Sequence, residues 1–590
     1  MDRIDGILGR LGKNRVYACI AGVLFPLILC IFAMCKVNKG LDITDTSFNL
    51  YNYGHVKDLD NMWFFAYLFT NLLGAFFTGL PFGNTMLGLN VYTGLVKCAL
   101  ILTAYFFFVR TVKIKKEYVF LALLAATGLC WCPTTVMYNY LTYLLFFAGT
   151  AFLYVGLTKE KDLFLILAGL ALGLNVFVRF PNICEVMLIL GAWFYLAIKK
   201  KPFSDIAKKT GFCIAGFAGG LLAGGLVILL SGRGISGYFE GISMLFSMTK
   251  EATSYSASGM LTDIFKTYLS AWPYVEMLIL GLLLVLLSSL VLPHKLEWLR
   301  YIFATLISLG LLWLLKRRGM FDFNYSTYAP VYYLGILVTI VAVVFFVFNM
   351  FVSKTPAEER LLCAIGVLTI IVTPLGTNNA LYANINNGFF VFPLLVYLLF
   401  SAERINRYFH TIYYGLFVLF LALTFQSVFF GARFVFRDGV NEEFTTRFTE
   451  GTVIKNMITT EKNADNLAGL LRLFDEKGEN REVLLYGNVS GLGFYLDRKV
   501  AIPSAWPSLP SFSSERFKEA VNDLSLKISE GGMSYPAVII SDEEKAAVLD
   551  GNSDLTTKQT ILKEFLVNSR YELVYDNERF CVLFANRNGE

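Results

Sequence analysis

Charged residues are scarce in this sequence. Asp, Glu, Lys and Arg make up 16% of its 590 residues, whereas 56% are hydrophobic and 16% are aromatic. Domains that fold in water carry about 25% charged residues, so an ordinary globular enzyme is excluded. The net charge of +6 does not indicate nucleic acid, because basic residues in so apolar a chain mark the cytoplasmic side of a membrane. We expect a polytopic membrane protein that binds no nucleic acid.

Motifs for disulfides, zinc and nucleotides are missing as well. Of the ten cysteines, only Cys581 lies beyond residue 430, and the nearest pair has the spacing Cys130-Trp-Cys132. That pattern indicates neither a disulfide framework nor a zinc site. The stretch GNVSGLG at 487–493 has the spacing GxxxGxG instead of the GxGxxG of dinucleotide-binding folds, so we expect no nucleotide there.

Long apolar runs occupy the first 430 residues. A membrane span needs roughly 20 predominantly apolar residues. The candidate runs cover residues 16–35, 63–80, 86–109, 117–131, 134–157, 162–178, 181–198, 211–231, 272–292, 298–315, 328–352, 361–376, 388–400 and 411–430. The first run is longer than a signal-peptide core and lacks a clear small-residue cleavage site, so we interpret it as a retained span.

The run 63–80 differs from the others because it contains polar and small residues, among them Asn71 and Gly74. If it does not span, the inner loops hold about twice as many Lys and Arg residues as the short outer loops, as the positive-inside bias requires. If it spans, the ratio is roughly reversed. The sequence therefore predicts an interfacial or re-entrant 63–80, thirteen spans and a cytoplasmic N-terminus.

The last part of the chain is polar. Residues 481–488, 498–504, 535–541 and 571–586 have strand patterns, and residues 513–530 and 556–569 have amphipathic helix patterns. Strands that alternate with helices indicate a small α/β domain. We expect a transmembrane domain at 1–430 and an extracytoplasmic α/β domain at 431–590.

Acidic residues gather in the first outer loop, GLDITDTSFNLYNYGHVKDLDNMW at 40–63, which contains Asp42, Asp45, Asp58 and Asp60. Asp42 and Asp45 are three residues apart, so a helical turn would point them the same way. A carboxylate there can act as general base on a hydroxyl or hold a divalent cation against a phosphate. The alternative is that Asp45 only caps the helix that follows.

Basic residues also lie on the predicted outer side, against the bias that sets the topology. They are Arg179 and the run Lys316, Arg317 and Arg318. Guanidinium groups bind phosphate bidentately, whereas the alternative is snorkelling toward lipid headgroups. Lys97 lies within an apolar run, where an ammonium group is costly and is a candidate functional group.

Neutral polar side chains mark the same outer rim. The candidates for contact with a sugar or acceptor are Tyr138, Asn139, Glu185, Asn378 and Asn379. Amides and phenols suit a sugar-binding cleft, although Asn-rich loops are also common as simple turns.

This layout resembles the GT-C superfamily of membrane glycosyltransferases, which includes oligosaccharyltransferase catalytic subunits, protein O-mannosyltransferases and aminoarabinose transferases. The resemblance rests on DITD at 42–45 in the first outer loop, the interfacial run after it, RFP at 179–181 and the C-terminal domain. The sequence departs from the family in having no adjacent Asp-Glu pair, no WWD and a DxxD spacing in place of DxD, so metal dependence and protein N-glycosylation are in doubt.

The resemblance implies an inverting glycosyltransferase of the plasma membrane. Its donor would be a polyprenyl-phosphate or pyrophosphate sugar, its acceptor a hydroxyl on a lipid, glycan or protein, and Mg or Mn stays open as a cofactor. Asp45, with Asp42 second, would activate the acceptor. Arg179, Lys97 and residues 316–318 would hold the phosphate.

Two other functions compete with this interpretation. A transporter or flippase of lipid-linked sugars would also use cationic groups in the membrane, but the sequence contains no duplicated segment of the kind common in transporters. A receptor would explain the C-terminal domain but not the acidic first loop.

Overall fold

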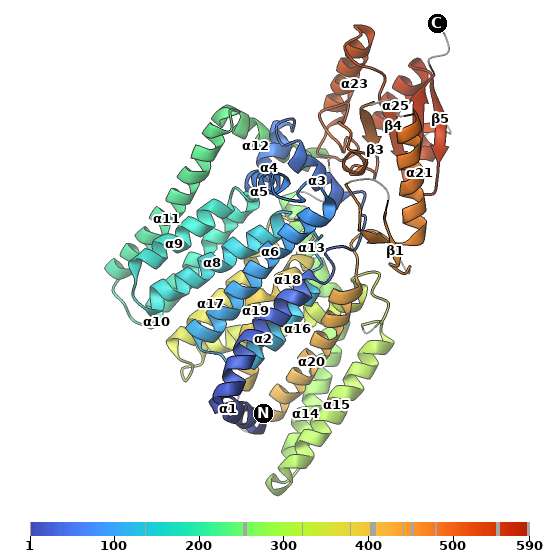
Figure 1. The fold of residues 1–590 in the computed structure, drawn as a ribbon. Coiled ribbons are helices and arrows are strands. Elements are labelled where there is room, and N and C mark those ends of the chain that lie inside the picture. Colours follow the sequence, from blue (N-terminus) through green and yellow to red (C-terminus); the bar gives the residue numbers. More distant parts are fainter. Residues whose placement is uncertain are drawn as a thin grey trace.

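The computed structural model describes residues 2–135, 137–251, 256–320, 322–377, 379–401, 409–439, 442–449, 453–477, 481–549 and 555–586. A long bundle of helices carries a smaller α/β domain at one end, and the N-terminal helix α1 (Asp2–Lys13) lies at the other end (Figure 1). An odd number of spans places the two ends of a chain on opposite sides in this way. The predicted fold class, a polytopic helical membrane protein with a C-terminal α/β domain, is confirmed.

The thirteen expected spans all form helices. Nine segments in the described ranges are long and apolar enough to cross a membrane. They are α2 (Arg15–Met34), α6 with η1 (Met86–Val112), α8 (Tyr138–Thr158), η2 with α10 (Phe180–Ile198), α11 (Phe203–Leu230), α14 (Trp272–Val291), α15 (Glu297–Arg317), α16 (Ala329–Phe351) and α20 (His410–Arg433). The other four are the shorter helices α7 (Lys116–Leu129), α9 (Asp162–Asn175), α17 (Ala357–Val372) and α19 (Gly388–Phe400).

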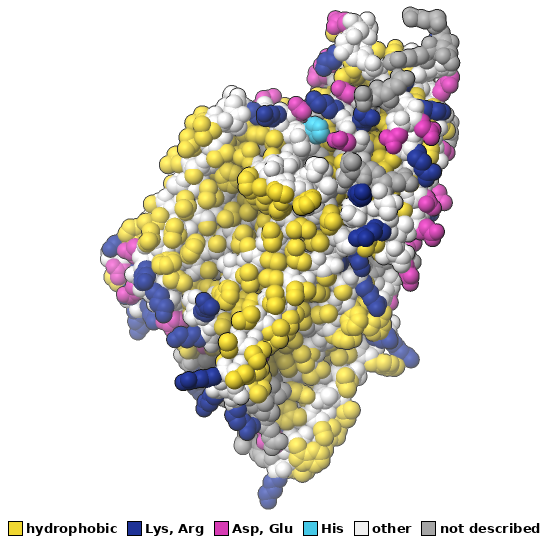
Figure 2. Space-filling model, viewed as in Figure 1, with side chains coloured by type: hydrophobic (Ala, Val, Ile, Leu, Met, Phe, Trp, Pro, Cys, Tyr) yellow, Lys and Arg dark blue, Asp and Glu magenta, His cyan; other side chains and the backbone are white. Residues whose placement is uncertain are grey.

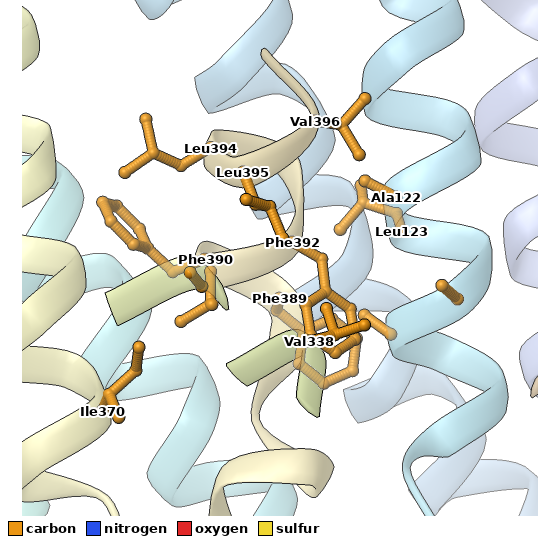
Figure 3. Packing of buried hydrophobic residues seen from close by; sticks show 14 of the residues in the cluster. Ala122, Leu123, Val338, Ile370, Phe389, Phe390, Phe392, Leu394, Leu395 and Val396 are labelled. Atoms are coloured by element: carbon orange, nitrogen blue, oxygen red, sulfur yellow. The ribbon is translucent and has the colours of Figure 1, made fainter. Parts of the chain in front are cut away.

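The short helix α19 can be almost wholly apolar because it lies at the centre of the bundle. Its side chains Phe389, Leu394 and Val396 are each no more than 4% exposed. Figure 3 shows the α19 side chains between those of α7, α16 and α17. A helix enclosed by other helices need not match the thickness of the lipid, which explains how a 13-residue helix serves here.

The run 63–80 does not form one continuous helix. It contains α4 (Asn61–Ala66) and α5 (Leu68–Thr78), which are separated at Tyr67 with φ −137° and ψ 45°. The Asn71 side-chain amide donates to the carbonyls of Trp63 and Phe64 at 2.9 and 3.2 Å, which stabilises the break. With 6 and 11 residues, neither helix is long enough to span, in agreement with the prediction.

Hydrophobic side chains cover the sides of the bundle, and Lys and Arg side chains gather at the end that holds the N-terminus (Figure 2). The same view shows acidic and basic side chains mixed on the C-terminal domain. This distribution agrees with a multi-pass membrane protein. A cytoplasmic N-terminus and an extracytoplasmic C-terminal domain remain predictions.

The C-terminal domain contains a four-stranded sheet in the order β3-β4-β6-β5. Its strands are β3 (Val483–Tyr486), β4 (Ala537–Ser541), β5 (Tyr571–Asp576) and β6 (Phe580–Ala585), and its long helices are α21 (Glu461–Lys477), α23 (Ser514–Ser529) and α25 (Thr557–Asn568). Strands β3 and β4 are parallel and the other pairs antiparallel. The predicted strand at 498–504 is wrong, because that segment makes only an isolated bridge from Val500 to Val483.

The first outer loop is fastened to the C-terminal domain. The Ile458 amide of β2 (Ile458–Thr459) donates to Asn38 O at 2.7 Å, and the Gly40 amide donates back to Ile458 O at 2.9 Å. Further along, Arg516 of α23 forms a salt bridge with Asp60 at 2.8 Å. The C-terminal domain therefore sets the position of the loop that carries the acidic residues.

The contacts of Gly491 show why the stretch 487–493 contains a glycine at this position. Its amide donates to Ile43 O at 2.8 Å, and a Cβ at this position would lie 1.5 Å from the Ser47 Oγ of α3 (Asp45–Gly54). Only glycine allows the domain to approach α3 so closely. The stretch packs the C-terminal domain on the first loop, a role that involves no nucleotide.

Candidate functional site

The two leading aspartates have different surroundings. The Asp42 carboxylate is 2% exposed and accepts three hydrogen bonds, from the Thr44 amide at 2.8 Å, the Thr44 hydroxyl at 2.5 Å and the Thr46 amide at 2.7 Å. These bonds satisfy amides at the start of α3, which no helical carbonyl can reach. The capping role that the sequence offered as an alternative for Asp45 thus belongs to Asp42.

Asp45 is the first residue of α3 and is 29% exposed. Its Oδ2 lies 2.6 Å from Nη1 of Arg437, a residue of the connection after α20. Burial raises the pKa of Asp45 to about 6, the nearby Arg437 opposes this rise, and the charge of Asp42 adds to it. A carboxylate with this pKa is mostly ionised at neutral pH and accepts a proton more readily than an ordinary aspartate.

A cavity lies next to these aspartates, and we call it the lysine cavity. Its lining residues include Lys36, Lys39, Asp42, Thr46, Asn90, Lys97, Thr134 and Tyr140. Lys36 Nζ donates to Phe434 O at 2.7 Å, and Lys97 Nζ lies 5.6 Å from the centre of the Tyr140 ring. In the described part of the chain, no salt bridge neutralises either lysine.

The electrostatics of the lysine cavity favour an anion. Burial, together with the charge of Lys97, lowers the pKa of Lys36 to about 7. Two ammonium groups that repel each other across a cavity are stabilised when an anion enters. Asn90, which is 1% exposed, also has a buried side-chain oxygen without a partner there.

A second cavity is lined by the N-terminal turn of α8, and we call it the amide cavity. Tyr138, Asn139, Arg179, Glu185 and Asn379, all predicted site residues, line it together with Asn182, Asn386 and Asn387. The first turn of α8 contributes to both linings, because Tyr140 lines the lysine cavity whereas Tyr138 and Asn139 line the amide cavity. The Trp131 amide of the lysine cavity donates to Asn386 Oδ1 of the amide cavity at 3.1 Å.

Arg179 and Glu185 are held in place within the amide cavity. The Arg179 guanidinium donates to Gly376 O and lies 5.1 Å from the centre of the Tyr138 ring. Both oxygens of Glu185 accept from the Asn175 amide, at 3.0 and 2.8 Å. Arg179 is therefore in a different cavity from Lys97, the other residue predicted to hold phosphate.

The remaining predicted residues are not part of either cavity lining. Lys316, Arg317 and Arg318 are exposed at the end of α15, where Lys316 and Arg317 lie over the rings of Phe323 and Trp313. Asn378 lies outside the described residues. The basic run at 316–318 is thus not brought together with the aspartates.

The sequence analysis missed Lys36, Lys39 and Arg437. All three are basic residues at the predicted outer face, against the positive-inside bias. They are therefore candidate phosphate ligands for the same reason as residues 316–318. Lys36 and Lys39 follow the first span directly, and Arg437 follows the last. Their convergence with Lys97 depends on the fold and is not visible in the sequence.

A resident divalent cation fits this site poorly. Mg and Mn prefer several carboxylate and water oxygens, whereas Asp42 is already hydrogen-bonded and Asp45 is paired with Arg437. In the described ranges, His, Cys, Asp and Glu form no group of three that could hold a metal. The lysines also supply positive charge where the cation would lie.

No protein-family model matches the chain, and no curated protein matches it. Among solved structures, it is similar to ArnT from Cupriavidus metallidurans bound to undecaprenyl phosphate, with 11% identity, a TM-score of 0.43, and coverage of 98% of this chain and 99% of that chain. It is also similar to the archaeal oligosaccharyltransferase AglB from Archaeoglobus fulgidus, in complex with an inhibitory peptide and a dolichol-phosphate. That match has 10% identity, a TM-score of 0.47, and coverage of 96% of this chain and 74% of that chain.

Proposed function

We propose that this chain is an integral-membrane glycosyltransferase that moves a sugar from a polyprenyl-phosphate or pyrophosphate donor to an extracytoplasmic hydroxyl, with inversion. The observation that carries the proposal is the lysine cavity. Lys36 and Lys97 face this cavity without an acidic partner in a described salt bridge, and Asp42 and Thr46 on its wall flank Asp45. A phosphate next to a carboxylate is the pairing that glycosyl transfer needs.

The chemistry follows from the positions of these groups. The Asp45 carboxylate takes the proton of the acceptor hydroxyl, and the resulting oxygen forms a bond to the anomeric carbon. The bond from that carbon to the phosphate oxygen breaks on the opposite face, and the electron pair leaves with the phosphate. Lys36 and Lys97 stabilise the charge that develops on this leaving group.

The amide cavity supplies a second part of the proposal. Its amides, phenols and the Arg179 guanidinium are groups that hydrogen-bond sugar hydroxyls. We assign to it, as a proposal, the binding of the sugar or acceptor through Tyr138, Asn139, Asn379 and Glu185. Lys316, Arg317 and Arg318 have no role in this scheme.

The test is transfer of radiolabel from a panel of polyprenyl-phosphate and pyrophosphate sugars to membrane acceptors by the purified protein. We expect transfer by the wild type and a loss of at least about 100-fold in Asp45→Asn, the lower range for removal of a general base. The matched control is Asp465→Asn on the exposed face of α21, which should leave transfer unchanged.

A different pattern would favour the transporter or flippase interpretation. If no donor supports transfer, but labelled lipid crosses the bilayer of proteoliposomes that contain the protein, the transferase proposal is wrong. The lysine cavity would then hold a lipid phosphate during transport.

A further inference from the structure

A third cavity lies between the first outer loop and the C-terminal domain, and we call it the interdomain cleft. One wall is a single face of α3. Phe48, Tyr51, Asn52 and His55 line the cleft, and their spacing of three, four and seven residues places them on one side of the helix. The opposite wall is formed by Lys499 to Ala505 with Glu482, Lys527 and Met533.

Two polar groups in this wall lack a partner. Asn52 is 5% exposed, and its side-chain amide makes no hydrogen bond to any residue that the structure describes. The indole Nε1 of Trp63, which also lines the cleft, is buried and unsatisfied. A buried donor without a partner is costly, so the Trp63 indole points to a ligand that forms hydrogen bonds.

Aromatic rings surround these polar groups. Tyr51 and His55 are stacked at a centroid distance of 4.2 Å, and Phe48 and Trp63 meet edge to face at 5.3 Å. The Tyr51 hydroxyl is already used, since it accepts from the Val500 amide at 2.9 Å. An aromatic wall with a planar amide suits a ligand that has both apolar C–H faces and hydroxyl groups.

The charges of the cleft exclude a strongly charged ligand. Asp58 and Glu482 contribute two acidic groups, and Lys499 and Lys527 contribute two basic groups. A phosphate or a polycation would meet like charge on one side. A neutral or zwitterionic polyol would not.

A peptide that binds as an added strand is also disfavoured. Strand β3 is at the edge of the sheet, but its free edge is occupied by the chain itself. The Val483 amide donates to Lys499 O at 2.9 Å, and the Ala501 amide donates to Val483 O at 2.8 Å. The edge that strand addition requires is therefore closed.

From this combination we propose that the interdomain cleft binds a saccharide, and that this saccharide is the non-reacting part of the acceptor. Asp45 begins α3 and Tyr51 is six residues further on, which corresponds to about 9 Å along a helix. A chain of a few sugars in the cleft can therefore extend toward Asp45. The identity of the saccharide as acceptor rests on the proposed function, whereas its binding does not.

The experiment measures binding of the full-length protein in detergent to an array of soluble, lipid-free oligosaccharides. Wild type is compared with Asn52→Leu and with Trp63→Phe, which removes the indole donor and keeps an aromatic ring. We expect wild type to bind one class of neutral or zwitterionic glycan and each variant to lose at least tenfold in affinity. Asn522→Ala on the exposed face of α23 is the matched control and should bind like wild type.

The outcomes separate this proposal from the proposed function. Absence of glycan binding, equal binding by all variants, or binding only of extended peptides from a peptide array would overturn the cleft proposal. Binding of glycan by wild type without transfer from any donor would leave the cleft valid and refute the transferase. In the transfer assay, Trp63→Phe should raise the acceptor KM and leave the donor KM unchanged.

Discussion

The pH dependence of transfer provides a sharp test of the site. Asp45 must be ionised to accept a proton, and burial together with Asp42 raises its pKa to about 6. Lys36 must be protonated to hold the phosphate, and burial together with Lys97 lowers its pKa to about 7. We therefore expect kcat/KM, which reports the free enzyme, to be bell-shaped with an optimum near pH 6.5.

The two values also determine the steepness of the bell. The expected rate is proportional to the fraction of Asp45 that is ionised multiplied by the fraction of Lys36 that is protonated. This product falls to roughly one-sixth of its maximum at about pH 5 and to about one-twentieth at about pH 8.5. The falling limb belongs to Lys36, so Lys36→Arg should abolish it, because a guanidinium stays protonated throughout this range. The rising limb belongs to Asp45 and should be unchanged in Lys36→Arg.

The assay is initial-rate transfer at donor concentrations well below KM between about pH 5 and 9. A phosphodiester donor stays ionised and an acceptor hydroxyl stays protonated across this range, so neither produces the limbs. A flat wild-type profile would refute the assignment of both groups. A falling limb that persists in Lys36→Arg would show that another residue carries the basic pKa.

Three further predictions concern the groups around Asp45. Arg437→Met should shift the rising limb of the same profile to higher pH, since Arg437 lowers the pKa of Asp45; an unmoved limb would mean that the ion pair is absent in solution. Asp42→Ala should cost about 1–3 kcal/mol of stability, because it leaves buried amides at the start of α3 without partners; denaturant unfolding in detergent measures this, and an unchanged midpoint would contradict the capping role. Gly491→Ala should lower both the Tm and transfer, because its Cβ would meet Ser47, whereas Gly532→Ala, which meets only the Lys527 carbonyl at 3.5 Å, should change neither.

Hydropathy alone was sufficient to locate the apolar helices. All thirteen expected runs form helices, and nine segments in the described ranges are long and apolar enough to cross a membrane. Apolar runs become helices because a helix satisfies its backbone hydrogen bonds internally in lipid. The run 63–80 was predicted from the loop charges to be interfacial or re-entrant, and its break into two short helices was not predicted. Asn71 stabilises that break through the carbonyls of Trp63 and Phe64. In the C-terminal domain, the segment 498–504 has a strand pattern, yet it follows the edge of β3 with only one bridge.

The roles of the two aspartates could not be assigned from their spacing. Which one caps α3 depends on the backbone at Thr44, whose φ of −115° and ψ of −111° turn the amides of Thr44 and Thr46 toward Asp42. The ion-pair partner of Asp45 is Arg437, which is almost 400 positions away in the sequence. The sequence shows which acids are present, whereas the fold determines which of them caps α3 and which forms the ion pair with Arg437.

The position of α3 connects these observations. Its first residue, Asp45, is the proposed base, and Asp42, which caps it, lines the lysine cavity. Its second and third turns line the interdomain cleft. The C-terminal domain holds the helix from the other side through Gly491 and through the Tyr495 hydroxyl, which donates to Asp42 O at 2.8 Å. Any ligand that moves this domain must therefore move α3, and with it the distance between Asp45 and the two lysines. The domain is thus a structural support of the proposed catalytic site, and its first residues, Phe434, Val435 and Phe436, line the lysine cavity.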